Sequence, residues 1–136
     1  MPAQVTPYPL SMVICDGLWR DPYTRKLTLI GLFTTIASDQ FPMSIPILSI
    51  YVALTDGQGE MPVRLELVDV DEERPPIFSD EQSINFTDPC MIMEMGFQKG
   101  GILVPHPGEY RLKLFANNEF IIERRLLVAG PSEEGE

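Results

Sequence analysis

Hydrophobic and polar residues alternate with a period of two along much of the chain, which is typical of β-strands that bury one face. In one clear case, Val63, Leu65 and Leu67 alternate with Arg64 and Glu66. The pattern predicts about eight extended segments, which are residues 11–15, 27–36, 47–54, 63–70, 83–87, 91–98 and the two strands of a closing hairpin, with a short apolar piece at 102–104.

Proline is frequent along the chain and limits helix formation. The sequence contains 13 prolines and 10 glycines, and a proline inside a helix costs about 3 kcal/mol. No stretch suits a crossover helix, which favours antiparallel pairing. We therefore predict an all-β fold, an antiparallel β-sandwich of about seven to eight strands. Residues 78–86 could instead hold one helical turn, and Gly31, inside a strand, predicts a bulge or a close backbone approach.

The length of 136 residues favours one domain. Residues 1–10 contain three prolines and are expected to form an irregular lead-in. Residues 11–129 form the predicted sandwich. Residues 130–136 contain three glutamates and are expected to be a flexible acidic tail.

The closing hairpin allows a sharper prediction, its register. A three-residue loop at 116–118 places opposite charges on one face and apolar residues on the other, whereas a two-residue loop would place Arg111 opposite Arg124. Like charges directly opposite each other are unfavourable, so we predict the three-residue loop. The expected pairs are Leu114–Phe120, Leu112–Ile122, Arg111–Glu123 and Glu109–Arg125.

Net charge narrows the range of partners. Twenty acidic and ten basic residues give a net charge of −10, which disfavours binding to nucleic acid and to anionic membranes. The chain has no apolar run of about 18 residues and no basic leader, so neither a membrane span nor a signal peptide is expected. A cytoplasmic location follows, in which Cys15 and Cys90 are expected to be buried thiols rather than a disulfide.

The residues typical of catalysis and cofactor binding are sparse. His106 is the only histidine and lies between two prolines, where an exposed loop residue is expected. One histidine and two distant cysteines lack the ligand pairs of a zinc site. The sequence contains no phosphate-binding glycine loop and no hydrolase or metalloprotease motif. We therefore expect no enzyme activity and no cofactor, although a site assembled from distant acidic loops would not appear in this pattern.

An acidic loop offers the best candidate for a metal site. Its four carboxylates could bind Ca²⁺, which needs 6–8 oxygen ligands, if Asp16, Asp21 or Asp56 joined them from other loops. The alternative is a solvated loop without a ligand. The four candidate residues are Asp69, Asp71, Glu72 and Glu73.

An aromatic and charged loop between the first two predicted strands is the best candidate for partner recognition. It contains Trp19, Arg20 and Tyr23, and these residue types are enriched at binding hot spots. The alternative is that this loop packs over one end of the sandwich.

Surplus apolar residues suggest a second interaction surface. Phe115, Ile121 and Leu127 fall on the predicted outer face of the closing hairpin, and Val68 and Ile92 also lie opposite their strands' main apolar rows. A contiguous apolar patch marks an interface. We expect a homo-oligomer that uses this face or the neighbouring strand edge, unless the N-terminal segment covers it in the same chain.

Two segments also carry a family resemblance. Cys15-Asp16-Gly17 with residues 26–33, and residues 107–112 with the turn and strand that follow, resemble the opening and the close of a family of small bacterial proteins of unknown function. The ending is also similar to immunoglobulin-like and C2-like sandwiches. Over roughly residues 11–128, the resemblance implies a compact sandwich of the bacterial cytoplasm. It implies no activity and no functional residue.

These observations favour a non-enzymatic protein-interaction or structural module, which binds a protein partner or itself. The alternative is a cation- or small-ligand-binding sandwich that uses its acidic end loops. A third possibility is an enzyme with a dispersed acidic site, which a pocket holding two or more carboxylates would favour.

Overall fold

The computed structural model describes residues 4–70 and 75–131, which form nine strands and no helix, so the all-β prediction is confirmed. In particular, these residues include no helix that could cross a membrane. The strands are β1 (Tyr8–Arg20), β2 (Leu27–Leu32), β3 (Thr35–Ala37), β4 (Met43–Thr55), β5 (Gly59–Asp69), β6 (Phe78–Phe86), β7 (Met93–Val104), β8 (Gly108–Ala116) and β9 (Glu119–Ala129).

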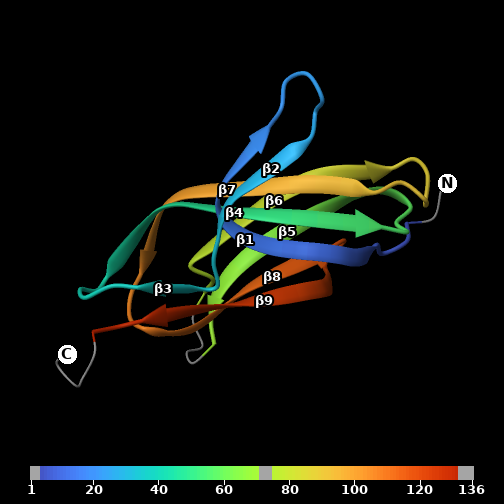
Figure 1. Ribbon diagram of the computed structural model, residues 1–136. Coiled ribbons are helices and arrows are strands. Elements are labelled where there is room, and N and C mark those ends of the chain that lie inside the picture. Colours follow the sequence, from blue (N-terminus) through green and yellow to red (C-terminus); the bar gives the residue numbers. More distant parts are fainter. Residues whose placement is uncertain (1–3, 71–74, 132–136) are drawn as a thin grey trace.

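The strands form two sheets that enclose one hydrophobic core (Figure 1). The four-stranded sheet has the order β2-β1-β4-β7, and the five-stranded sheet has the order β3-β9-β8-β5-β6. All pairs are antiparallel except β3–β9, which is parallel. The expectation of antiparallel pairing throughout is therefore wrong at this one edge.

The strand count differs from the prediction because segment 27–36 divides between the two sheets. The Phe33 N–H donates to the Ile14 carbonyl of β1 at 3.2 Å. One residue later, the Thr34 carbonyl accepts from the Leu127 N–H of β9 at 3.0 Å. The chain therefore leaves one sheet and joins the other between β2 and β3. Conversely, predicted segments 91–98 and 102–104 merge into β7.

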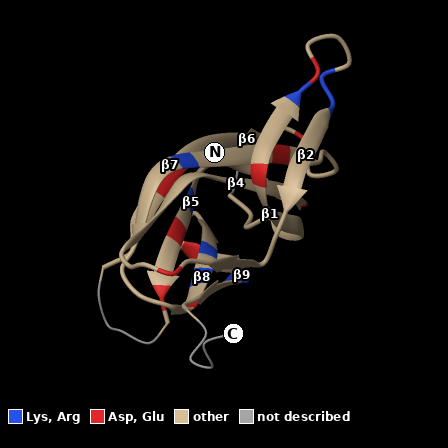
Figure 2. Ribbon diagram, turned by 60° about the vertical axis from the view of Figure 1, so that its left-hand side comes forward, with Lys and Arg blue, Asp and Glu red and all other residues tan. Residues whose placement is uncertain are grey.

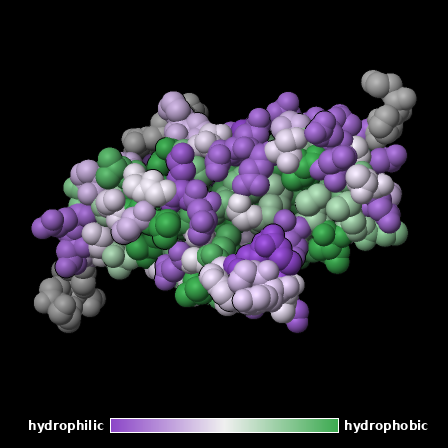
Figure 3. Space-filling model, turned by 90° about the horizontal axis from the view of Figure 1, so that it is seen from above, coloured by the Kyte–Doolittle hydropathy of each residue, from purple (hydrophilic) through white to green (hydrophobic). Residues whose placement is uncertain are grey.

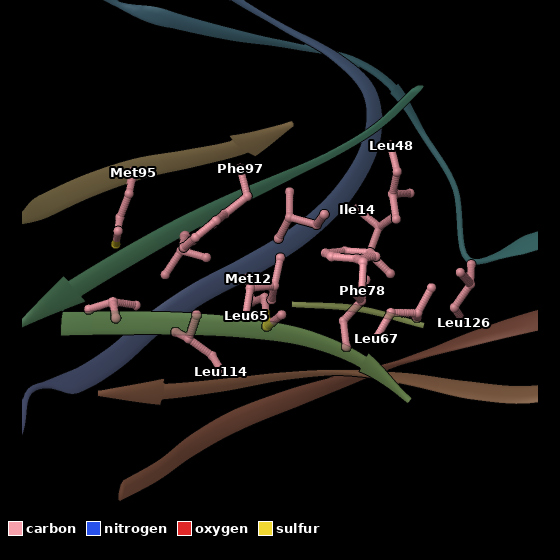
Figure 4. Packing of buried hydrophobic residues seen from close by; sticks show 14 of the residues in the cluster. Met12, Ile14, Leu48, Leu65, Leu67, Phe78, Met95, Phe97, Leu114 and Leu126 are labelled. Atoms are coloured by element: carbon pink, nitrogen blue, oxygen red, sulfur yellow. The ribbon is translucent and has the colours of Figure 1, made fainter. Parts of the chain in front are cut away.

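Alternating residues of both sheets fill the core (Figure 4). On β5, Val63, Leu65 and Leu67 have no exposed surface, and on β4 Leu48 and Ile50 are equally buried. Burying each such side chain contributes about 1.5–3 kcal/mol. The period-two pattern therefore identifies the inward faces correctly, and segment 78–86 is a strand rather than a helical turn.

The predicted register of the closing hairpin is wrong. Asn117 and Asn118 both have positive φ, 51° and 66°, and form a two-residue turn of the kind that Asn favours. A register shift between Leu114 and Phe115 then offsets the strands further, so that Arg111 lies opposite Arg125. Since the total offset from the predicted pairing is even, most side chains keep their predicted face.

The opposed arginines are compatible because carboxylates lie diagonally between them. Arg111 contacts Glu109 at 2.9 Å and Glu123 at 2.7 Å, and Arg125 contacts Glu109 at 3.3 Å. The hydrogen bond that Arg111 donates to Glu109, together with the negative charge of Glu123, raises the pKa of the Arg111 guanidinium. The predicted opposite-charge contacts thus form, but across diagonals rather than directly opposite.

The N-terminal segment is more regular than expected. β1 begins at Tyr8, and Val5 forms an isolated bridge to Gln58, with its N–H 3.0 Å from the Gln58 carbonyl. Both Val5 and the start of β1 lie within residues 1–10, which were expected to be irregular. Most of the predicted acidic tail lies outside the described residues.

Candidate interaction site

A two-stranded hairpin projects from the four-stranded sheet (Figure 1). It consists of the C-terminal half of β1, the loop at residues 21–26 and β2, and we call residues 16–32 the arm. Its strands pair antiparallel from Arg20–Leu27 at the tip to Gly17–Ile30 near the base. At the base, Gly31 has φ 70°, and an added Cβ would lie 2.4 Å from an Asp16 carboxylate oxygen, which confirms the expected close approach.

The tip of the arm is held by its own hydrogen bonds. One carboxylate oxygen of Asp21 accepts from the N–H of Tyr23 at 2.7 Å and of Thr24 at 3.2 Å, and the Asp21 carbonyl accepts from the Arg25 N–H at 2.8 Å. The Arg20 guanidinium donates to the Arg25 carbonyl at 2.7 Å. These bonds close the loop into a defined turn, so the side chains it carries are presented in a fixed arrangement.

The tip places two aromatic side chains in solvent. Tyr23 is 93% exposed and Trp19 is 52% exposed. The structure therefore does not place these residues over the end of the sandwich, which was the alternative to an interaction role.

The two faces of the arm differ. Leu18 packs against Gly96 of β7, where an added Cβ would lie 2.5 Å from its side chain, so one face leans on the sheet. Trp19 and Ile30 share the opposite face, since opposed and alternate residues of a ladder point to the same side. Ile30 is 53% exposed, and Leu32 at the base is 64% exposed. The sequence analysis did not single out Ile30 or Leu32, although both lie in the predicted segment 27–36, which is rich in apolar residues.

The arm is locally basic in an acidic chain. Residues 16–32 contain Arg20, Arg25 and Lys26 against Asp16 and Asp21, and three minus two gives a net charge of +1, whereas the whole chain carries −10. In the ribbon, the basic segments of the arm flank its loop (Figure 2). The tip thus combines aromatic and cationic groups.

The other predicted interaction residues do not form a single patch. Phe115 is half-buried, with the Phe120 ring 6.0 Å away and the Arg64 guanidinium 4.5 Å above its ring. Ile121 lies in the irregular part of β9 and packs against the core. Leu127 is exposed on the outer face. Figure 3 shows a different face, on the side of the arm, where hydrophobic and hydrophilic groups are interspersed.

The described part of the N-terminal segment does not cover the outer face of the closing hairpin, which was the alternative to a homo-oligomer. Gln4 and Thr6 contact Asn117 and Glu119 at the β8–β9 turn rather than the middle of the hairpin face.

The acidic candidates are dispersed. Asp69 is the last residue of β5, and its side chain is fully buried 2.7 Å from the Nε2 atom of His106. The expectation of a solvated loop residue is therefore wrong for Asp69, whereas His106 does lie in the turn between β7 and β8, with 32% of its side chain exposed. Asp71, Glu72 and Glu73 lie outside the described residues. Within the described part of the chain, no three potential ligands gather into a metal cluster.

The Asp69–His106 contact belongs to a small network of polar contacts. The Nδ1 atom of His106 lies 2.8 Å from the Pro107 carbonyl, and the Tyr110 hydroxyl donates to the His106 carbonyl at 2.6 Å. Every second residue of β5 from Met61 to Leu67 points into the core, and Asp69 is the next residue in this alternation. The alternation in the sequence could therefore have predicted that the Asp69 carboxylate is buried.

A groove of about 370 Å³ lies at the base of the arm and is lined by Ile14, Leu32, Phe33 and Arg124, among others. A second of about 370 Å³ lies on the other side of Phe33 and includes Asp16. Neither lining holds two carboxylates.

A family model described as "Family of unknown function (DUF6941)" matches residues 10–129, so the chain belongs to that family. No curated protein matches the sequence. The matching solved structures include two crystal structures of a β-glucosidase from Listeria innocua. The complex with glucose is 11% identical, with a TM-score of 0.43, over 96% of this chain and 16% of that chain. The complex with isofagomine is 13% identical, with a TM-score of 0.44, over 91% and 16% respectively. The chain thus spans about one sixth of those proteins.

Proposed function

We propose that this protein is a non-enzymatic protein-interaction module of the bacterial cytoplasm and that the arm is its recognition element. The observation that carries the proposal is the projection of the arm, whose fixed tip presents Trp19 and Tyr23 to solvent. Cys15 and Cys90 are both free thiols, which is compatible with a reducing compartment, but Cys90 is exposed rather than buried as expected.

Two physical features of the tip support a role in binding, namely its residue types and the hydrogen bonds that fix its loop. Trp, Tyr and Arg are enriched at binding hot spots, and the two aromatic residues bury much surface with few rotatable bonds. A loop already fixed by the Asp21 hydrogen bonds loses little entropy when a partner binds. Arg20 and Arg25 favour an acidic or mixed partner surface.

An immunoglobulin-like scaffold is part of this proposal. Tyr110 lies near the start of β8, and its hydroxyl donates to the carbonyl four residues upstream at 2.6 Å. This arrangement resembles the tyrosine corner of immunoglobulin-like sandwiches, which present binding loops at their ends.

The cation-binding alternative has less support. Three of its four candidate residues lie outside the described part of the chain, and the fourth, Asp69, contacts His106. Neither of the two grooves beside Phe33 holds the paired carboxylates that would support an enzymatic site.

Affinity purification from native cells tests the proposal. We expect the wild-type protein to retain a partner, either another protein or a second copy of this chain, and the double variant Trp19→Ser/Tyr23→Ser to lose it. Leu103→Ser is the matched control, since Leu103 is 60% exposed on β7. Equal retention by the arm variant and the control would contradict the proposal.

A further inference from the structure

Exposed strand edges invite pairing with another chain, and folded proteins usually protect them with charges, prolines, shortness or a covering side chain. In the part of the chain that the structure describes, most edges carry such protection. β3 has three residues, and β6 carries Asp80 and Glu81. β7 carries charges, and the Gln82 side chain donates to the Gly96 carbonyl at 2.8 Å.

The gap between β1 and β9 is closed by an arginine. β3 pairs with only the last residues of β9, from Leu127 on, and leaves the rest of that edge uncovered. The Arg124 guanidinium donates to the Met12 carbonyl at 3.0 Å and to the Glu123 carbonyl at 3.2 Å. One side chain therefore occupies main-chain acceptors on both edges.

The outer edge of β2 has none of these devices. Its sequence, Leu27–Leu32, contains no charge and no proline. The Asp21 N–H donates to the Lys26 carbonyl at 2.9 Å, which marks that pair as hydrogen-bonded. Because bonded and non-bonded pairs alternate along a ladder, the main-chain groups of Leu27 and Leu29 point away from β1. They form an open template for another strand.

Charge favours a second copy as the occupant. Each arm carries +1 while the whole chain carries −10, so the basic residues of one arm are attracted to the acidic residues of the other copy. Antiparallel pairing also places the two acidic bodies at opposite ends of the joined arms, where salt screens their repulsion. It brings Arg25 and Lys26 of each copy toward the base of the other arm, where Asp16 is exposed.

We infer that two copies of this chain associate by antiparallel pairing of their β2 edges, which joins the exposed faces of Trp19 and Ile30 into one apolar surface. This inference rests on the proposed role of the arm and names its partner. The four-stranded sheets of the two copies become one continuous eight-stranded sheet, since each contributes four strands.

Sedimentation velocity on the full chain at high micromolar concentration tests the inference. We expect a species of twice 15.3 kDa for the wild type. Ile30→Lys places a charge on the edge, and Leu29→Pro removes an outward N–H without breaking the bond to β1; both should halve the mass. Leu103→Lys, on a residue that is similarly exposed, should leave the dimer intact.

Circular dichroism shows whether each variant is folded, and Ile30→Lys remains informative if the proline variant is not. A wild-type species of 15.3 kDa alone would overturn the inference, as would a dimer that persists in folded Ile30→Lys. Neither result would contradict the proposed function, because affinity purification measures separately whether the arm retains a different protein.

Discussion

The network around Asp69 shows how a single buried carboxylate is accommodated. Its side chain is fully buried at the inner end of β5, and His106 lies 2.7 Å away. A buried carboxylate without hydrogen bonds would be strongly destabilising. The turn that contains His106 is in turn fixed by Tyr110. These residues thus secure the connection between β7 and β8.

We expect Tyr110→Phe to lower the free energy of unfolding by about 1 kcal/mol, because it removes the bond to the His106 carbonyl while preserving the ring. Urea unfolding measures this change. Tyr8→Phe is the control, since the Tyr8 side chain is largely exposed. Equal effects of the two substitutions would contradict the assigned role of Tyr110.

Tyr51 gives a prediction in the alkaline range. Burial, followed by the hydrogen bond to Glu94, raises the pKa of Tyr51 from 10.0 to about 12. A pKa that is higher in the folded state contributes stability below pH 10, and this contribution is lost as the pH rises from 10 to about 12. Unfolding measured across this window should show the loss in the wild type and a smaller one in Tyr51→Phe. An identical pH dependence would contradict this assignment.

At the scale of elements, Gly31 allows the chain to leave the arm and cross to the other sheet. It has φ 70° and lies against Asp16, whereas Gly101 has φ 61° with open space around it. We expect each change to alanine to destabilise by on the order of 1–3 kcal/mol through backbone strain. Gly31→Ala should cost more, because Asp16 must also move. Urea unfolding that ranks Gly101→Ala as equal or worse would contradict this account.

The bridge made by Arg124 gives a second prediction at this scale. Arg124→Ala should accelerate hydrogen exchange at the amides of β9 between Phe120 and Leu126, since the two edges lose the side chain that joins them. Arg125→Ala is the control, because its side chain contacts Glu109 on the outer face. Equal protection in both variants would show that Arg124 does not close this edge.

The elements also show what sequence patterns can and cannot predict. Alternation in β5 identifies its buried face because burial acts on each residue locally. The register of β8 and β9 depends on the turn formed by Asn117 and Asn118 and on a bulge. Matching opposite charges across the two strands could not predict the effect of that bulge. The arginines then find Glu109 and Glu123 along diagonals.

At the scale of the whole molecule, the structure separates a packed body from a projecting arm. Sequence reasoning located Trp19, Arg20 and Tyr23 as recognition candidates from residue type. It could not foresee that β2 stays with the arm while β3 joins the other sheet, since this depends on contacts between distant strands. For the same reason, it placed Phe115 and Ile121 on one surface, which the bulge in β9 divides.

The central claim is that this protein meets its partners through the arm. Photo-crosslinking in native cells tests it most directly, with a photoreactive residue in place of either Tyr23 or Leu103, both of which are exposed. The account predicts a discrete cross-linked product from position 23 and none from position 103. Cross-linking from position 103 alone would contradict it.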